Sequence, residues 1–190
     1  GLRLGPALLK LISSVHSDVV DLVRPFLEQL SANVNETVTL ARASGTQLAI
    51  IHYVVASREL RVVPRIGLNL PLYSTSGGRV LLAMESDEDV RILVGEAYED
   101  LTGMTVKTLP QLLELIADVR ANGLAIDLGE TLEGVCTIAV ALDTLFGRFS
   151  ISLLVPAARF HKNETFYRKE LMQCKEAIAN EIGRIITVVE

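Results

Sequence analysis

Two hydrophobic periods alternate along this chain, and they restrict it to folds that combine helices with a sheet. Within 6–30 and 163–186, apolar residues recur every three or four positions, as they do on one face of a helix. Between these regions lie shorter segments rich in β-branched and alternating apolar residues, which are typical of extended chain. These segments are 36–42, 47–56, 60–64, 124–128, 135–142 and 148–155. The pattern predicts one α+β domain with flanking helices.

Local signals divide the helical part of the chain. The N-terminal pattern predicts helices over 6–16 and 18–30. Pro25 lies inside the second of these, and we expect a kink or a new helix there because proline lacks the N–H that a helix interior needs. Gly123 is expected to end a helix. The other helices are predicted over 76–85, 86–96, 109–122 and 163–186.

Composition and charge exclude several classes of protein. The 190 residues suffice for one substantial core, and the net charge of -5 argues against this chain itself gripping a nucleic-acid backbone. Cys136 and Cys174 are too few for a disulfide scaffold and fit a reducing cytoplasm. No apolar run approaches the length of a membrane span, so no membrane partner is expected. Because the sequence begins at Gly1 without Met, we expect a fragment of a longer protein.

The segment 70–79, LPLYSTSGGR, joins an extended start to small residues that enter a helix. Pro71 holds the preceding residue extended, and Ser74, Thr75 and Ser76 are all suitable N-caps. Two glycines follow and allow backbone N–H groups to approach a ligand. Because these N–H groups and the positive end of the helix dipole point the same way, the segment is a candidate anion site. Ordinary capping and close packing explain the same residues equally well.

Two further segments carry polar side chains that can line a pocket. Asp127, Glu130 and Glu133 lie close together with no Lys or Arg between them. Such carboxylates can act as an acid and a base, although a solvated loop has the same composition. Asp127 adjoins an apolar strand and is expected to point inward, where it needs a donor, either a ligand hydroxyl or a capped backbone. Ser150 and Ser152 share one face of a strand, and either a pocket or the neighbouring backbone can satisfy them.

The sequence contains no familiar motif for a cofactor, a metal or a catalytic nucleophile. The patterns GxxxxGK[ST], GxGxxG, HExxH, CxxC and GxSxG are all absent, and the three histidines are scattered. We therefore expect no cofactor, no metal site and no catalytic residue.

Three stretches agree in order and spacing with one known family. The first is 2–5 with the helix that follows it. The second is 61–83, which contains Leu-Pro-Leu-Tyr and Gly-Arg-Val-Leu-Leu-Ala, and the third is 123–139, with Gly-x-x-x-Asp-x-x-Glu followed by Gly and Ile-Ala. Together they resemble the C-terminal effector-binding domain of the IclR family of bacterial transcriptional regulators. Tyr73 and Arg79 replace the usual His and Lys of that family.

The resemblance implies a GAF-like curved antiparallel sheet with helices on one side. Residues 1–17 would form a linker helix from a missing N-terminal DNA-binding domain, and 18–190 the effector-binding domain. The pocket of this family lies on the sheet and takes a small organic acid. Its apolar lining would fall on Val62 and Leu70, its carboxylate-binding amides on Ser76 and Gly77, and its polar side chains on Asp127, Thr137 and Ser152, with Ser150 or Leu154 beside Ser152.

The resemblance also implies a function and partners. The leading interpretation is a cytoplasmic sensor domain that binds a carboxylate metabolite without converting it. It would form a homodimer or tetramer and act on DNA only through the missing domain. One alternative is an enzyme that uses Asp127 and Glu130 as an acid–base pair, and another is an oligomerisation module without a working ligand site.

Overall fold

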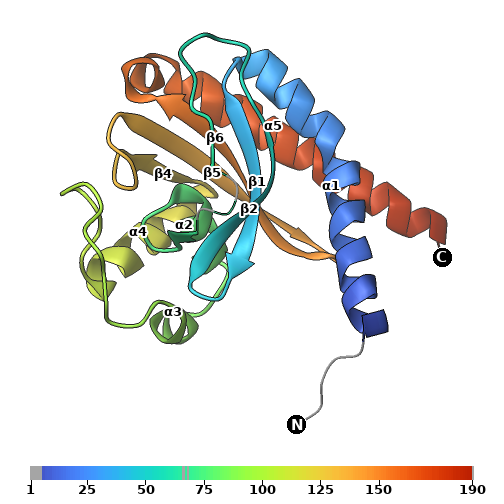
Figure 1. Ribbon diagram of the computed structural model, residues 1–190, viewed down its shortest axis with the longest axis horizontal. Helices are drawn as coiled ribbons and strands as arrows, with labels where there is room; N and C mark the ends of the chain where they lie inside the picture. The colour runs from blue at the N-terminus through green and yellow to red at the C-terminus, as the bar shows by residue number, and fades with distance from the viewer. Residues whose placement is uncertain (1–5, 66, 68, 190) are drawn as a thin grey trace.

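The computed structural model describes residues 6–65, 67 and 69–189, and within them it forms a six-stranded sheet with helices on both faces (Figure 1). The strands lie in the order β3-β2-β1-β6-β5-β4, and every neighbouring pair is antiparallel. Their bounds are β1 Thr37–Ser44, β2 Gln47–Val54, β3 Leu70–Pro71, β4 Ala125–Leu128, β5 Val135–Thr144 and β6 Gly147–Pro156. The predicted α+β class and antiparallel sheet are therefore confirmed.

One face of the sheet is covered by the two long helices, α1 (Pro6–Val34) and α5 (Ala157–Val189), which also contact each other (Figure 1). Alternate residues of β5 and β6, such as Ile138, Val140 and Ile151, are buried in the core beneath them. This alternation follows from the two-residue period of a strand. The side chains between them point to the opposite face.

The opposite face carries α2 (Ser76–Leu82) and α4 (Leu109–Asn122), with α3 (Asp87–Val94) beside them. Ala139 of β5 packs there against Val80 of α2 and Val119 of α4. The expectation of helices on one side of the sheet is therefore wrong. The physical reason is that β5 and β6 are apolar or small on both faces, so each face must be covered.

Two helix boundaries also differ from expectation. The two N-terminal patterns form a single helix, α1, and no new helix begins at Pro25. Pro25 lies on the exposed side of α1, between Val23 and Leu27, which are both fully buried. Their burial holds the helix together across the hydrogen bond that proline cannot make. Helix α5 begins at Ala157 rather than Asn163, directly after β6.

Other features of the fold agree with the sequence or add to it. Cys136 and Cys174 are both buried and free, and burial raises the pKa of the Cys174 thiol to about 12. The segment 60–64 is an irregular connection rather than a strand.

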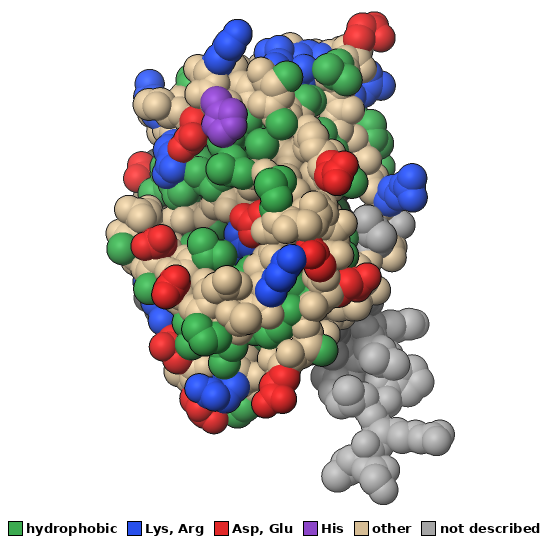
Figure 2. Space-filling view, turned by 90° about the vertical axis from the view of Figure 1, so that its left-hand side faces the viewer, with side chains coloured by type: hydrophobic (Ala, Val, Ile, Leu, Met, Phe, Trp, Pro, Cys, Tyr) green, Lys and Arg blue, Asp and Glu red, His purple; other side chains and the backbone are tan. Residues whose placement is uncertain are grey.

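No helix in the described part of the chain is long and apolar enough to cross a membrane. On the face shown in Figure 2, acidic and basic side chains are interspersed with apolar ones.

Candidate ligand site

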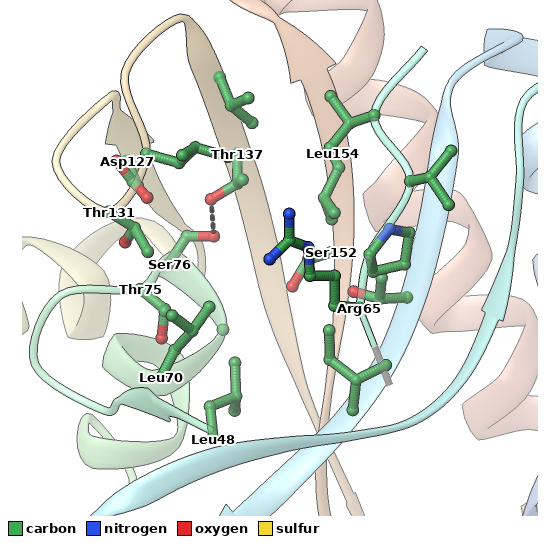
Figure 3. Close-up of a pocket in the computed structure, with 18 residues that line it drawn as sticks. Leu48, Arg65, Leu70, Thr75, Ser76, Asp127, Thr131, Thr137, Ser152 and Leu154 are labelled. Atoms are coloured by element: carbon green, nitrogen blue, oxygen red, sulfur yellow. Dashed lines mark hydrogen bonds between the residues drawn. The ribbon is translucent and has the colours of Figure 1, made fainter. Parts of the chain in front are cut away.

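A cavity of about 330 Å³ lies between the sheet and the start of α2 (Figure 3). Its walls come from the inner face of the sheet, from α2, from the segment 62–65 and from the turn between β4 and β5. The lining residues are Thr39, Leu48, Ile50, Val62, Val63, Pro64, Arg65, Leu70, Thr75, Ser76, Gly77, Asp127, Thr131, Leu132, Val135, Thr137, Ser152 and Leu154. Most of these side chains are apolar, with a few polar groups among them, which is typical of sites for small organic molecules.

Strand register explains why distant residues meet in this cavity. Asp127 of β4 pairs with Thr137 of β5, which pairs in turn with Leu154 of β6. On the other side of β6, Ser152 pairs with Thr39 of β1, the next strand of the sheet. Residues that are directly opposite in neighbouring antiparallel strands point to the same face. The register therefore places these side chains side by side on the face of the sheet that carries α2.

The start of α2 packs closely against the sheet and against Leu72 because two of its residues lack a side chain. A Cβ added at Gly77 would lie 2.9 Å from Ser150 Oγ, and one at Gly78 would lie 2.1 Å from the carbonyl oxygen of Leu72. Thr75 caps the helix by accepting a hydrogen bond from Gly78 N at 2.9 Å. Both glycines thus have a packing reason, which the sequence alone did not separate from ligand contact.

The polar wall of the cavity contains a hydroxyl pair and a carboxyl group. Ser76 Oγ and Thr137 Oγ1 are 2.6 Å apart and share a hydrogen bond (Figure 3). Asp127 is 1% exposed and accepts a hydrogen bond of 2.6 Å from Glu130 N. Burial raises the pKa of the Asp127 carboxyl, and hydrogen bonds from Thr131 and Glu130 N oppose that shift.

Glu130 faces away from the cavity and pairs with Arg79. The Arg79 guanidinium donates to both carboxylate oxygens of Glu130, and its Nε donates to the carbonyl oxygen of Tyr73 at 2.9 Å. The hydroxyls of Thr102 and Thr105 both donate to the carbonyl oxygen of Glu130. These contacts hold the turn after Asp127 against α2. They also leave Glu130 poorly placed to share a substrate with Asp127 as an acid–base pair.

The structure brings together most of the residues that the sequence singled out. Seven of them line the cavity, namely Val62, Leu70, Ser76, Gly77, Asp127, Thr137 and Ser152. Ser150 does not line it, because Gly77 covers its fully buried side chain. Leu154, rather than Ser150, shares the cavity with Ser152. Within the described ranges, no group of His, Cys, Asp and Glu side chains has the geometry to hold a metal ion.

Several lining residues escaped the sequence-based prediction. Thr39, Leu48 and Ile50 belong to β1 and β2, and their strand pattern carried no sign of which face meets α2. Thr131 and Leu132 lie in the turn after Asp127, and Arg65 lies in the connection before β3. For Thr131, Leu132 and Arg65, the only signal in the sequence was that they lie close to residues already singled out.

Comparison with known proteins decides the family. The model of the bacterial transcriptional regulator IclR C-terminal domain matches residues 12–182 of this chain. The chain belongs to the IclR family. The HTH-type transcriptional regulator TtgV of Pseudomonas putida is 39% identical over 184 residues, which cover 97% of this chain and 71% of TtgV.

Solved structures of IclR relatives share the fold. A transcriptional regulator from Rhodococcus, RHA06195, is 27% identical and superimposes with a TM-score of 0.83 over 96% of this chain and 77% of its own. The C-terminal domain of Escherichia coli KdgR is 28% identical, with a TM-score of 0.77 over 87% of this chain and 99% of its own. The chain is thus an IclR effector-binding domain. Its relatives are transcriptional regulators, not enzymes.

Proposed function

We propose that this IclR domain binds a small organic acid in the cavity beside α2, leaves it chemically unchanged, and thereby alters DNA binding by the regulator to which it belongs. The observation that carries the proposal is the cavity itself, in which the β4–β5–β6 register gathers Asp127, Thr137 and Ser152 opposite the start of α2. A volume of about 330 Å³ suits a molecule of metabolite size.

The polar groups of the cavity have distinct roles in this proposal. The backbone N–H groups of Ser76 and Gly77 bind the ligand carboxylate, as donors at a helix start can. Asp127 accepts a hydrogen bond from a ligand hydroxyl, and Thr137 and Ser152 supply hydroxyls. Val62 and Leu70 cover the apolar part of the ligand. Each of these side chains borders the cavity, which supports the assignment.

A continuous set of hydrogen bonds supports transmission to α1. Arg159 donates to the carbonyl oxygen of Leu60, next to the segment that borders the cavity, and to both carboxylate oxygens of Glu36. Ser31, near the end of α1, donates to the carbonyl oxygen of Glu36 at 2.9 Å. A ligand that shifts the segment 62–65 therefore acts on residues packed at the end of α1.

The remaining parts of the proposal concern the whole regulator. A DNA-binding domain precedes the chain, residues 1–17 link it to the effector-binding domain of 18–190, and the protein acts in the cytoplasm as a homodimer or tetramer. Residues 2–5, which resemble the family linker, lie outside the described residues. The matched region covers 71% of TtgV and 56% of the E. coli regulator KdgR.

Thermal shift against a panel of small organic acids tests the binding proposal. At least one acid should raise the unfolding temperature, and mass spectrometry should recover it unaltered. Turnover of the bound acid would instead support an enzyme, and the lack of any response would support an oligomerisation module. With the stabilising acid, the full-length regulator should then change its affinity for operator DNA.

The helix start offers a matched pair of variants. Thr75 has φ -93° and ψ 146°, an extended conformation that a following proline requires. Ser76 is the first helical residue, where proline is well tolerated. Ser76→Pro removes both the hydroxyl and the N–H, whereas Ser76→Ala removes only the hydroxyl. If the N–H binds the acid, Ser76→Pro weakens binding more than Ser76→Ala; equal affinities would contradict that role.

A further inference from the structure

Arg65 is a cationic side chain in the cavity wall. It has no role in the ligand contacts proposed above, which involve backbone N–H groups, hydroxyls and Asp127. It lies in the connection between β2 and β3, and its guanidinium points toward the centre of the cavity (Figure 3). The residue is exposed, so one side of the guanidinium remains in contact with water. Among the residues that the structure describes, Arg65 makes no ion pair and no side-chain hydrogen bond.

Asp127 does not serve as the partner of Arg65. No ion pair joins these two described residues, and the Asp127 carboxyl accepts its hydrogen bond from Glu130 N instead. The cavity thus presents a guanidinium and a carboxyl group that do not neutralise each other. Apolar side chains, such as those of Leu70 and Leu154, line the space around them.

The position of Arg65 is defined by the segment that precedes it. Thr37 Oγ1 donates a hydrogen bond of 2.6 Å to the carbonyl oxygen of Val62. Arg159 donates a second bond, of 2.9 Å, to the carbonyl oxygen of Leu60. These two bonds hold the backbone three and five residues before Arg65 against the body of the domain. The Arg65 side chain extends over the cavity from the segment that these bonds hold.

We propose that Arg65 is the specificity-determining counter-ion of the ligand carboxylate, and that the ligand is a hydroxy acid with an apolar body. In this arrangement Arg65 pairs with the same carboxylate that the Ser76 and Gly77 N–H groups bind, and the ligand hydroxyl donates to Asp127. Arginine suits this role because its planar guanidinium binds a carboxylate through two charge-assisted hydrogen bonds. The inference rests on the proposed function, since it names the class of acid that the same cavity selects.

Isothermal titration of the purified chain with 4-hydroxybenzoate and its neutral analogue 4-hydroxybenzamide tests the inference. These probes share an apolar ring and a hydroxyl but differ in charge at the opposite end. The wild-type chain should prefer the acid by about tenfold or more, as expected for charge-assisted hydrogen bonds. Arg65→Met should remove this preference without changing the affinity for the amide, and Arg65→Lys should restore part of it.

Arg61→Met is the matched control, because Arg61 lies in the same segment, donates to the carbonyl oxygen of Arg58 and does not line the cavity. It should retain the wild-type preference. Asp127→Asn should reduce the advantage of 4-hydroxybenzoate over benzoate, which lacks the hydroxyl. An unchanged acid-to-amide ratio in Arg65→Met would overturn the role of Arg65. Wild-type binding of other acids but neither probe would overturn the hydroxy-acid assignment while leaving the proposed function intact.

Discussion

Thr37 ties the segment over the cavity to the first residue of β1. Its hydroxyl donates a hydrogen bond of 2.6 Å to the carbonyl oxygen of Val62 and also accepts one from Ala56 N at 3.2 Å. The Thr37 side chain is fully buried, its bond with Ala56 N is buried, and its bond with the Val62 carbonyl is half-buried. This one residue therefore connects the sheet, the start of the connection after β2, and the cavity wall.

Thr37→Val should lower the free energy of unfolding by about 1–3 kcal/mol, because it leaves the buried Ala56 N–H and the half-buried Val62 carbonyl without this partner. The affinity for any cavity ligand should fall as well, since Val62 loses its anchor. Urea denaturation and calorimetry measure the two effects. Thr37→Ser keeps the hydroxyl and should retain most of the binding; comparable losses of affinity in both variants would argue against the hydrogen bond as the cause.

Gly77→Ala should destabilise the domain by about 1–3 kcal/mol through overpacking. The added methyl would lie 2.9 Å from Ser150 Oγ and 3.0 Å from Leu48 Cδ2, so these side chains or α2 itself must shift. Ser150→Ala removes the closest of these atoms. The double variant should therefore recover part of the stability in a double-mutant cycle. Strictly additive losses would show that Ser150 does not limit the approach of α2.

The Arg79–Glu130 pair predicts a large effect from a single neutralising change. Arg79 is 1% exposed, and Glu130→Gln would leave its charge buried with only carbonyl partners, at a cost of about 3–5 kcal/mol. Glu88→Gln breaks an exposed pair with Arg91 and should change stability by less than about 1 kcal/mol. Urea denaturation of both variants provides the comparison, and similar small losses would mean that the buried pair does not hold the turn.

Asp127 predicts a pH dependence with a defined sign. Burial raises its pKa in the folded state above the ordinary value of 3.8, so folding favours the protonated carboxyl. The contribution of Asp127 to stability is therefore fully present below pH 3.8 and declines as the pH rises through the raised folded pKa. Asp127→Asn lacks this charge, and its stability relative to wild type should improve from acidic toward neutral pH.

Unfolding in urea at a series of pH values measures this difference. The matched control is Asp143→Asn, at an exposed position near the end of β5. Its stability relative to wild type should show no comparable rise. A constant difference between wild type and Asp127→Asn across the series would mean that the Asp127 pKa is not raised in the folded domain.

Local patterns in the sequence were sufficient for much of the fold. Alternating and β-branched segments predicted the main strands, and Gly123 ended α4 as expected because it adopts φ 76°, which glycine tolerates best. The capping residues before α2 also pointed to the correct helix start, with Thr75 as the cap. These features depend on neighbours in the chain, which is why they can be recognised without a structure.

The make-up of the cavity depended on contacts between distant segments. Ser150, Ser152 and Leu154 share one face of β6, yet Gly77 covers the first and leaves the other two beside the cavity. Alternation predicts the face of a strand, but it carries no information on where a helix will lie across that face. Arg65 shows the same limit, because its side chain meets the cavity only through the path of an irregular connection. Periodicity therefore specified the elements, whereas strand register and helix packing selected the residues that form the site.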